Sequence, residues 1–172
     1  MALQWLKDAD PVQIASNAGI CYDAEASGFR FPFLGEEVTV RYPSFQIEPQ
    51  QNGWCSLLIL HYLHLADGYP LTGKEISFCQ MKDGMVRGGG IDRKIESAIS
   101  RMDGLDEEML TRVCSRLGGQ RIKTNADIAF LIPFLPRFPV TLKVWFADEE
   151  FPASGRLLLD ASADHYFAML IC

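Results

Sequence analysis

Hydrophobic and polar positions change their period several times along the chain. Near the N-terminus, Asp10-Pro11 opens a helical pattern that continues to Ala18, and Gly19 follows as a stop signal. Runs of β-branched and aromatic residues come next, separated by glycine or proline, and they span residues 20–22, 29–33 and 38–42. This change of period predicts a short helix followed by a meander of antiparallel strands in one layer.

The run Trp54–Ala66 is long, rich in leucine and free of charged residues, which predicts a helix rather than a strand. At about 100° per residue, Ser56 and Leu63 lie on one side of this helix, and Leu57 and His61 lie on the opposite side. Because apolar residues occupy both sides, we expect the helix to be buried nearly all round.

The next part of the chain predicts one more strand and two helices. Residues 75–78 indicate a strand, and the glycines at 88–90 are expected to form a loop. Apolar residues then recur every three or four positions over 91–102 and over 105–117. This spacing predicts two amphipathic helices that form a helical hairpin.

Apolar and polar residues alternate over 140–146, the period expected of a half-buried strand. A second strand is expected at 156–160, and the acidic turn between the two predicts an antiparallel hairpin. The final segment, residues 162–172, fits either a helix or a strand.

Taken together, the pattern predicts an α+β fold: an antiparallel or mixed β-sheet of short strands packed against one buried helix and a helical hairpin. The 172 residues, of which 48% are hydrophobic, are enough for one core, so we expect a single domain over 1–172. Neither repeats nor a linker-like tract interrupts the chain.

The net charge of the chain limits the classes of partner that we expect it to bind. The formal net charge is −6, and acidic residues are interleaved with the basic ones, which argues against nucleic acid and against an anionic membrane surface. The apolar runs are too short to span a bilayer, and the N-terminus lacks the pattern of a signal peptide. We therefore expect a cytoplasmic protein.

The five cysteines are far apart, and the chain contains no CxxC pair. This spacing argues against a disulfide framework and against a local zinc or iron-sulfur site, since such sites draw paired ligands from one tight turn. The cysteines are expected to be free thiols.

Two phrases, LLILHYLHLADGYPLTGKEISF at 57–78 and LKVWFADEEFPASGRLLLDASADHY at 142–166, carry a resemblance. They are similar to a bacterial and archaeal family classified as a domain of unknown function, some members of which are joined to an iron-sulfur segment. The resemblance implies a shared α+β fold and an association with anaerobic redox metabolism, in which a redox protein is one candidate partner, but it implies no catalytic residues. This chain has no cysteine cluster, so an iron-sulfur centre would not lie in it alone.

Aromatic and ionisable residues beside apolar elements indicate a pocket for a small ligand or partner. We expect it between the helix at 54–66 and the acidic hairpin, where carboxylates could also bind Mg²⁺ or Ca²⁺ and His61 could share a metal with His64. The identities of the cofactor and of the metal stay open. The expected ligand-binding residues are His61, Tyr62, Trp145, Asp148, Glu149 and Asp160.

Other interpretations of the sequence remain. Cys55 at a helix start, with His165 later in the chain, fits the logic of a papain-like cysteine hydrolase, with Asp148 or Asp160 orienting the histidine. The glycines at 88–90 before a helix could hold an anion on their amides. A third alternative is a protein-interaction module without a pocket, which docks through an exposed aromatic patch.

Overall fold

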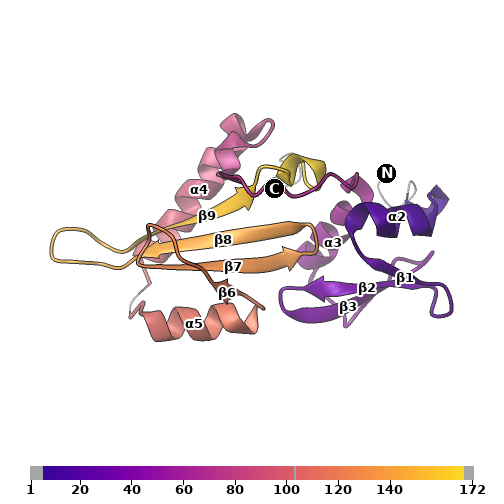
Figure 1. Ribbon diagram of the computed structural model, residues 1–172, viewed down its shortest axis with the longest axis horizontal. Helices are drawn as coiled ribbons and strands as arrows, with labels where there is room; N and C mark the ends of the chain where they lie inside the picture. The colour runs from indigo at the N-terminus through magenta and orange to yellow at the C-terminus, as the bar shows by residue number, and fades with distance from the viewer. Residues whose placement is uncertain (1–5, 103, 169–172) are drawn as a thin grey trace.

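The computed structural model describes residues 6–102 and 104–168. Helices and antiparallel strands occur together in this part of the chain, which confirms the predicted α+β class (Figure 1). The strands are short, and they form two separate sheets rather than one. A shared hydrophobic core runs from the first sheet to the second.

The first sheet follows helix α2 (Pro11–Ala18), whose bounds are as predicted. Asp10 caps it, because its carboxylate accepts a hydrogen bond from the Val12 amide at 3.0 Å, and Gly19 ends it in the left-handed conformation at φ 65°. The predicted meander is confirmed, in the order β1-β2-β3-β4. Its strands are β1 (Cys21–Asp23), β2 (Gly28–Phe33), β3 (Glu36–Arg41) and β4 (Ile47–Glu48).

The second sheet has the order β5-β9-β8-β7-β6, and every pairing in it is antiparallel. Its strands are β5 (Glu75–Ile76), β6 (Gln120–Arg121), β7 (Ile128–Leu135), β8 (Phe138–Trp145) and β9 (Ser154–Asp160). The predicted hairpin is therefore present as β8 and β9, with the acidic turn between them. Strand β5 is shorter than predicted, because the chain turns at Ser77 into the 3-10 helix η1 (Phe78–Gln80).

Helix α3 (Gly53–Leu65) begins at the Asn52 cap, whose side chain accepts a hydrogen bond from the Cys55 amide at 2.9 Å. The prediction that this helix is buried all round is wrong. Trp54 is 69% exposed, and the fully buried residues are confined to one face. The reason is that α3 packs against α2 and the core on that face, whereas Trp54 and Leu57 are exposed.

Helix α4 (Gly84–Ser100) contains the glycine run, so the predicted loop at 88–90 is wrong, and so is an anion site at a helix start there. The glycines permit close packing: a Cβ on Gly88 would lie 2.2 Å from the Phe78 carbonyl oxygen. Helix α5 (Glu107–Arg116) follows. Helix α4 packs on η1 and β9, whereas α5 packs on β6 and β7, so the two lie at opposite edges of the sheet rather than as a hairpin (Figure 1).

The end of the chain forms a short 3-10 helix, η2 (Ala163–His165), and continues to Ala168. The rest of the segment predicted as a helix or strand, 169–172, lies outside the described residues. Among the described helices, none has the length and apolar character needed to cross a membrane.

Candidate ligand-binding site

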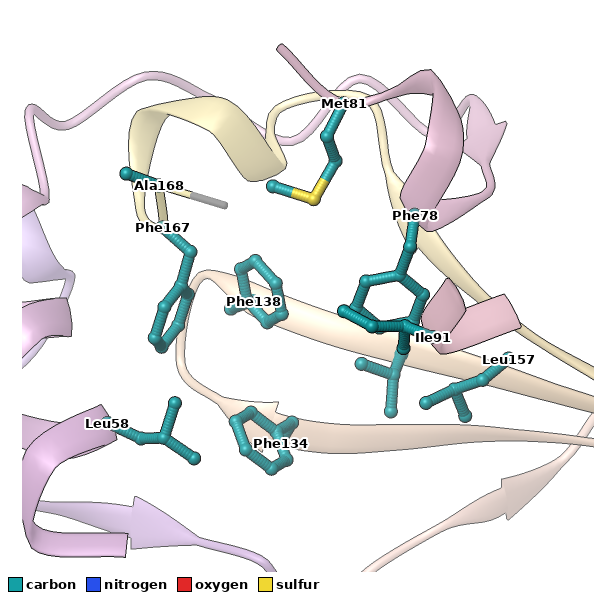
Figure 2. Close-up of a pocket in the computed structure, with 10 residues that line it drawn as sticks. Leu58, Phe78, Met81, Ile91, Phe134, Phe138, Leu157, Phe167 and Ala168 are labelled. Carbon is teal, nitrogen blue, oxygen red and sulfur yellow. The ribbon is translucent and has the colours of Figure 1, made fainter. Parts of the chain in front are cut away.

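An apolar cavity of about 230 Å³ lies where five segments from distant parts of the chain meet. Figure 2 shows side chains converging on it from α3, from η1 and the residue after it, from α4, from the second sheet and from the C-terminal segment. Its walls carry no polar surface. The lining residues are Leu58, Phe78, Met81, Ile91, Phe134, Phe138, Val140, Leu157, Phe167 and Ala168.

Aromatic contacts fix one side of the cavity. Phe138 and Phe167 meet with ring centroids 4.7 Å apart at 66°, and Phe134 meets Phe138 at 6.1 Å and 61°. These edge-to-face arrangements are the favoured geometry for aromatic pairs. They hold the C-terminal segment against the turn that joins β7 to β8.

The opposite side is fixed by Asp92 on α4. Its two carboxylate oxygens accept hydrogen bonds from the amides of Phe78 at 3.2 Å and Cys79 at 3.1 Å. These are the first amides of η1, which would otherwise lack partners. Asp92 therefore holds η1 against α4 and sets the direction in which Phe78 points.

The residues that line the cavity differ in how far they are exposed to solvent. Met81, Phe138 and Val140 are buried and form its interior, whereas Leu58 and Ile91 are partly exposed. Because the space is partly open to solvent, an apolar group can reach these buried residues from outside. The arrangement suits binding of a small apolar group rather than chemistry, because no lining residue carries an acid, base or nucleophile.

None of the six predicted ligand-binding residues lines this cavity. Tyr62 is fully buried, and its hydroxyl donates a hydrogen bond to the Ala18 carbonyl at 2.6 Å and accepts one from the Arg137 amide at 2.9 Å. Burial raises the pKa of this hydroxyl. Tyr62 thus joins α3 to α2 and to the β7–β8 turn, and it does not line the apolar cavity.

Asp160 is also engaged within the protein. Its carboxylate accepts hydrogen bonds from the amides of Thr72, Gly73 and Ser162 and from the Thr72 hydroxyl, at 2.7–2.9 Å. Burial acts to raise its pKa, but these bonds favour the charged form and lower the pKa to about 2. The carboxylate fixes the 72–73 turn against the end of β9.

Asp148 and Glu149 lie in the loop between β8 and β9, which projects from the end of the sheet away from α3 (Figure 1). Asp148 accepts hydrogen bonds from the amides of Phe151 at 2.7 Å and Glu150 at 2.9 Å, and these bonds lower its pKa. Trp145 lines a separate polar hollow. The structure therefore places Asp148, Glu149 and Trp145 away from Tyr62, and it does not bring the predicted residues together around one space.

His61 is partly buried on α3, and its Nδ1 has no hydrogen-bond partner among the described residues. Burial lowers the pKa of His61, and the neighbouring His64 lowers it further. The ring is therefore neutral at neutral pH. The described residues contain no group of three or more histidine, cysteine, aspartate or glutamate side chains arranged to hold a metal ion.

The alternative catalytic pair is separated by the length of α3. Cys55 lies at the start of the helix, and the imidazole of His165 lies beyond its end, where Nδ1 is 2.6 Å from the Asp67 carboxylate. Ten residues of helix between Cys55 and Leu65 span about 15 Å. Cys55 and His165 therefore cannot form a thiolate–imidazole pair, and neither Asp148 nor Asp160 orients the histidine.

Sequence patterns did not single out the residues of the cavity, because apolar side chains at helical or strand spacing are indistinguishable from ordinary core. One signal was available. Residues 128–140 contain three phenylalanines and three prolines in a short span, an unusual density of bulky residues around one turn. Two of those rings, Phe134 and Phe138, line the cavity.

The fold and site define an α+β protein with two antiparallel sheets and an apolar cavity at the junction of its helices. A family model described as a domain of unknown function, DUF3786, matches residues 10–170, and the chain belongs to that family. Searches of curated proteins and of solved structures found no match.

Proposed function

We propose that the protein binds a small apolar ligand in the cavity, as an accessory protein rather than as an enzyme. The observation that carries the proposal is the wholly apolar lining of a space of about 230 Å³ that is partly open to solvent. Apolar cavities of roughly 150 Å³ already hold a benzene molecule. The cavity therefore suits one substituted ring or a short alkyl chain, with any polar group of the ligand outside.

A thermal-unfolding assay with n-butylbenzene tests this proposal. Saturation at about 100 times the dissociation constant stabilises the folded state by about 2.7 kcal/mol, which corresponds to roughly 5–10 °C in Tm for a chain of this size. Leu58→Phe places a ring in the cavity and should abolish the shift. Leu57→Phe, at the neighbouring exposed position, should leave it unchanged. A shift that survives Leu58→Phe, or no shift at all, contradicts the proposal.

The association with anaerobic redox metabolism implied by the resemblance makes a redox-active ring one suitable ligand class. Duroquinone, a single fully substituted ring, is the corresponding probe for the same assay. A larger Tm shift with duroquinone than with n-butylbenzene would favour a redox-active ligand. Equal Tm shifts with the two compounds would show that the cavity binds an apolar ring without preferring a redox-active one.

A second candidate function is partner binding through the outer face of α3. This helix is free of charge, yet Trp54 is 69% exposed and Leu57 is 37% exposed. Large apolar side chains exposed side by side are typical of an interface. A second copy of the chain is the first partner to test, by sedimentation velocity. Association that Trp54→Gln removes would support this function, and a monomer at all concentrations would exclude self-association.

A further inference from the structure

Gly155 shows which face of strand β9 meets helix α4. A Cβ placed on Gly155 would lie 2.2 Å from Cδ1 of Ile99 on α4, so this residue faces the helix. Successive residues of a strand point to opposite faces of the sheet. The side chains of Ser154 and Arg156, which flank Gly155, therefore point to the face away from α4.

Strand β8 adds an indole and an ammonium group to this same face. The register pairs Trp145 with Ser154 and Lys143 with Arg156, and side chains of directly opposite residues share a face. Trp145 and Arg156 are diagonal neighbours across the two strands. Their separation of about 7–8 Å is one that aromatic and long side chains bridge, so a ligand can contact both.

A hollow of about 490 Å³ lies at these side chains. Binding sites for small molecules commonly enclose roughly 300–1,000 Å³. Two residues from outside the strand pair also line it, Glu96 of α4 and Asn125 of the loop between β6 and β7. We call this space, lined by Glu96, Asn125, Lys143, Trp145, Ser154 and Arg156, the polar hollow.

Only two of the charges in the polar hollow are available to a ligand. Lys143 is already paired, because its Nζ lies 2.5 Å from the Glu75 carboxylate and its side chain is only 12% exposed. Neither Arg156 nor Glu96 has an ion pair or a hydrogen bond from its side chain to another described residue. One guanidinium and one carboxylate, of opposite charge, thus remain at the same hollow.

The Trp145 indole is available as well. It is partly exposed, and it makes no ring contact and no hydrogen bond with another described residue. Aromatic rings pack on an indole in offset or edge-to-face arrangements. The polar hollow therefore combines an aromatic surface, a free cation and a free anion.

We propose that the polar hollow binds a free aromatic α-amino acid. Its α-carboxylate pairs with Arg156, whose guanidinium can donate two parallel hydrogen bonds, and its ammonium group pairs with Glu96. Its ring packs on the Trp145 indole. A zwitterion satisfies both free charges, whereas a simple anion would face the Glu96 carboxylate without a counter-charge.

This inference goes beyond the proposed function, because it concerns a different ligand at a different surface. L-Phenylalanine is the probe, and its binding to the whole chain is followed by a ¹⁵N–¹H NMR titration of the indole N–H signals. The signal of Trp145, assigned with Trp145→Phe, should shift, and that of the exposed Trp54 should not. A shift of Trp54 alone, or no shift at about 10 mM ligand, would overturn the proposal.

Two analogues of the probe each lack one charge. 3-Phenylpropionate has no ammonium group, and 2-phenylethylamine has no carboxylate. Each should bind at least about fivefold more weakly than L-phenylalanine, because one charge of the polar hollow is left without its partner. Equal binding of L-phenylalanine and 3-phenylpropionate would overturn the recognition of a zwitterion.

Protein variants test the two charged residues. Arg156→Gln should weaken L-phenylalanine at least about fivefold. Lys94→Gln removes an exposed cation of α4 that does not line the hollow, and it should change binding less than about twofold. Glu96→Gln should remove the preference for L-phenylalanine over 3-phenylpropionate. Equal effects of Arg156→Gln and Lys94→Gln would show that Arg156 does not bind the carboxylate.

Leu58→Phe separates the polar hollow from the apolar cavity, which also suits a phenyl ring. In this variant L-phenylalanine should still bind, although the response to n-butylbenzene is lost. Loss of both would assign L-phenylalanine to the cavity and overturn the present inference. In the wild type, an intact n-butylbenzene response without binding of L-phenylalanine would overturn the polar hollow alone.

Discussion

His165 Nδ1 lies 2.6 Å from the Asp67 carboxylate, and the same imidazole ring stacks on Tyr69 with centroids 3.8 Å apart at 5°. The pair joins the segment after α3 to the C-terminal segment, 98 positions away in the sequence. The next residues after His165 continue this attachment, since the Tyr166 hydroxyl donates to the Tyr69 carbonyl and Phe167 lines the cavity. The Asp67–His165 pair therefore helps to hold one wall of the cavity in place.

Asp67→Asn should lower the stability of the protein in a way that depends on pH. Burial acts to raise the pKa of Asp67, but the hydrogen bonds from His165 and the Tyr69 amide lower it below the usual value. A lowered native pKa contributes stability that is present above the unfolded pKa, about 3.9, and is lost as the pH falls through the native pKa.

Because both side chains are partly exposed, the expected loss at pH 7 is at most about 1 kcal/mol. Urea unfolding of the wild type and of Asp67→Asn at pH 7 and pH 2.5 measures it. The difference between the two proteins should shrink at the lower pH, while Met85→Leu, at an exposed position that carries no titratable group, should show no such dependence. An unchanged difference at both pH values would rule out this role for the carboxylate.

Tyr62→Phe should destabilise the protein by about 2–3 kcal/mol. The variant keeps the ring but leaves the buried Ala18 carbonyl and the Arg137 amide without their partner. Tyr69→Phe is the control, because the Tyr69 side chain is 45% exposed, and it should change stability by less than about 0.5 kcal/mol. Chemical denaturation compares the two, and similar small losses would show that the Tyr62 hydroxyl is dispensable.

Gly88→Ala should destabilise the protein, while Gly89→Ala should stabilise it. A Cβ on Gly88 would lie 2.2 Å from the Phe78 carbonyl oxygen, whereas a Cβ on Gly89 meets nothing within 4 Å. We expect a loss of about 2–3 kcal/mol for the first variant from overpacking. The second should gain about 0.5–1 kcal/mol from helix propensity. Thermal unfolding of both variants shows whether each substitution raises or lowers the stability. If both substitutions change the stability in the same direction, the close approach of α4 to η1 is refuted.

Local signals were sufficient for several elements of the fold. Helix α2 has its cap, its first-turn proline and its final glycine in the sequence, and the β8–β9 hairpin has the alternation of a half-buried strand. In both cases the determining residues lie within a few positions of each other. The meander over β1–β3 was predictable for the same reason.

The glycine run shows where local signals fail. Gly88–Gly90 resembles a loop, because glycine disfavours helix, but the run lies within α4. What decides the structure there is the backbone of Phe78, which α4 contacts so closely that no side chain fits at Gly88. A contact between two segments that are not adjacent cannot be read from the composition of either one.

The residues suggested as a site by the sequence do not meet in the fold, for a related reason. Ionisable residues were chosen as candidates because such side chains can bind ligands or catalyse reactions. In the structure, however, the polar atoms of Tyr62 and Asp160 form hydrogen bonds that hold turns and neighbouring elements together. The cavity is lined instead by apolar residues such as Leu58 and Phe167, which lie 109 positions apart in the sequence. Their convergence depends on the tertiary fold.

The central claim is that the apolar cavity holds an apolar ligand, and intermolecular nuclear Overhauser effects test it most directly. With n-butylbenzene and protein labelled at its methyl groups, we expect contacts from the ligand to the methyls of Leu58, Met81 and Ile91, and none to the exposed Met85. Contacts to Met85 or Leu57 in place of these cavity methyls, or no contacts at a saturating ligand concentration, would contradict the account.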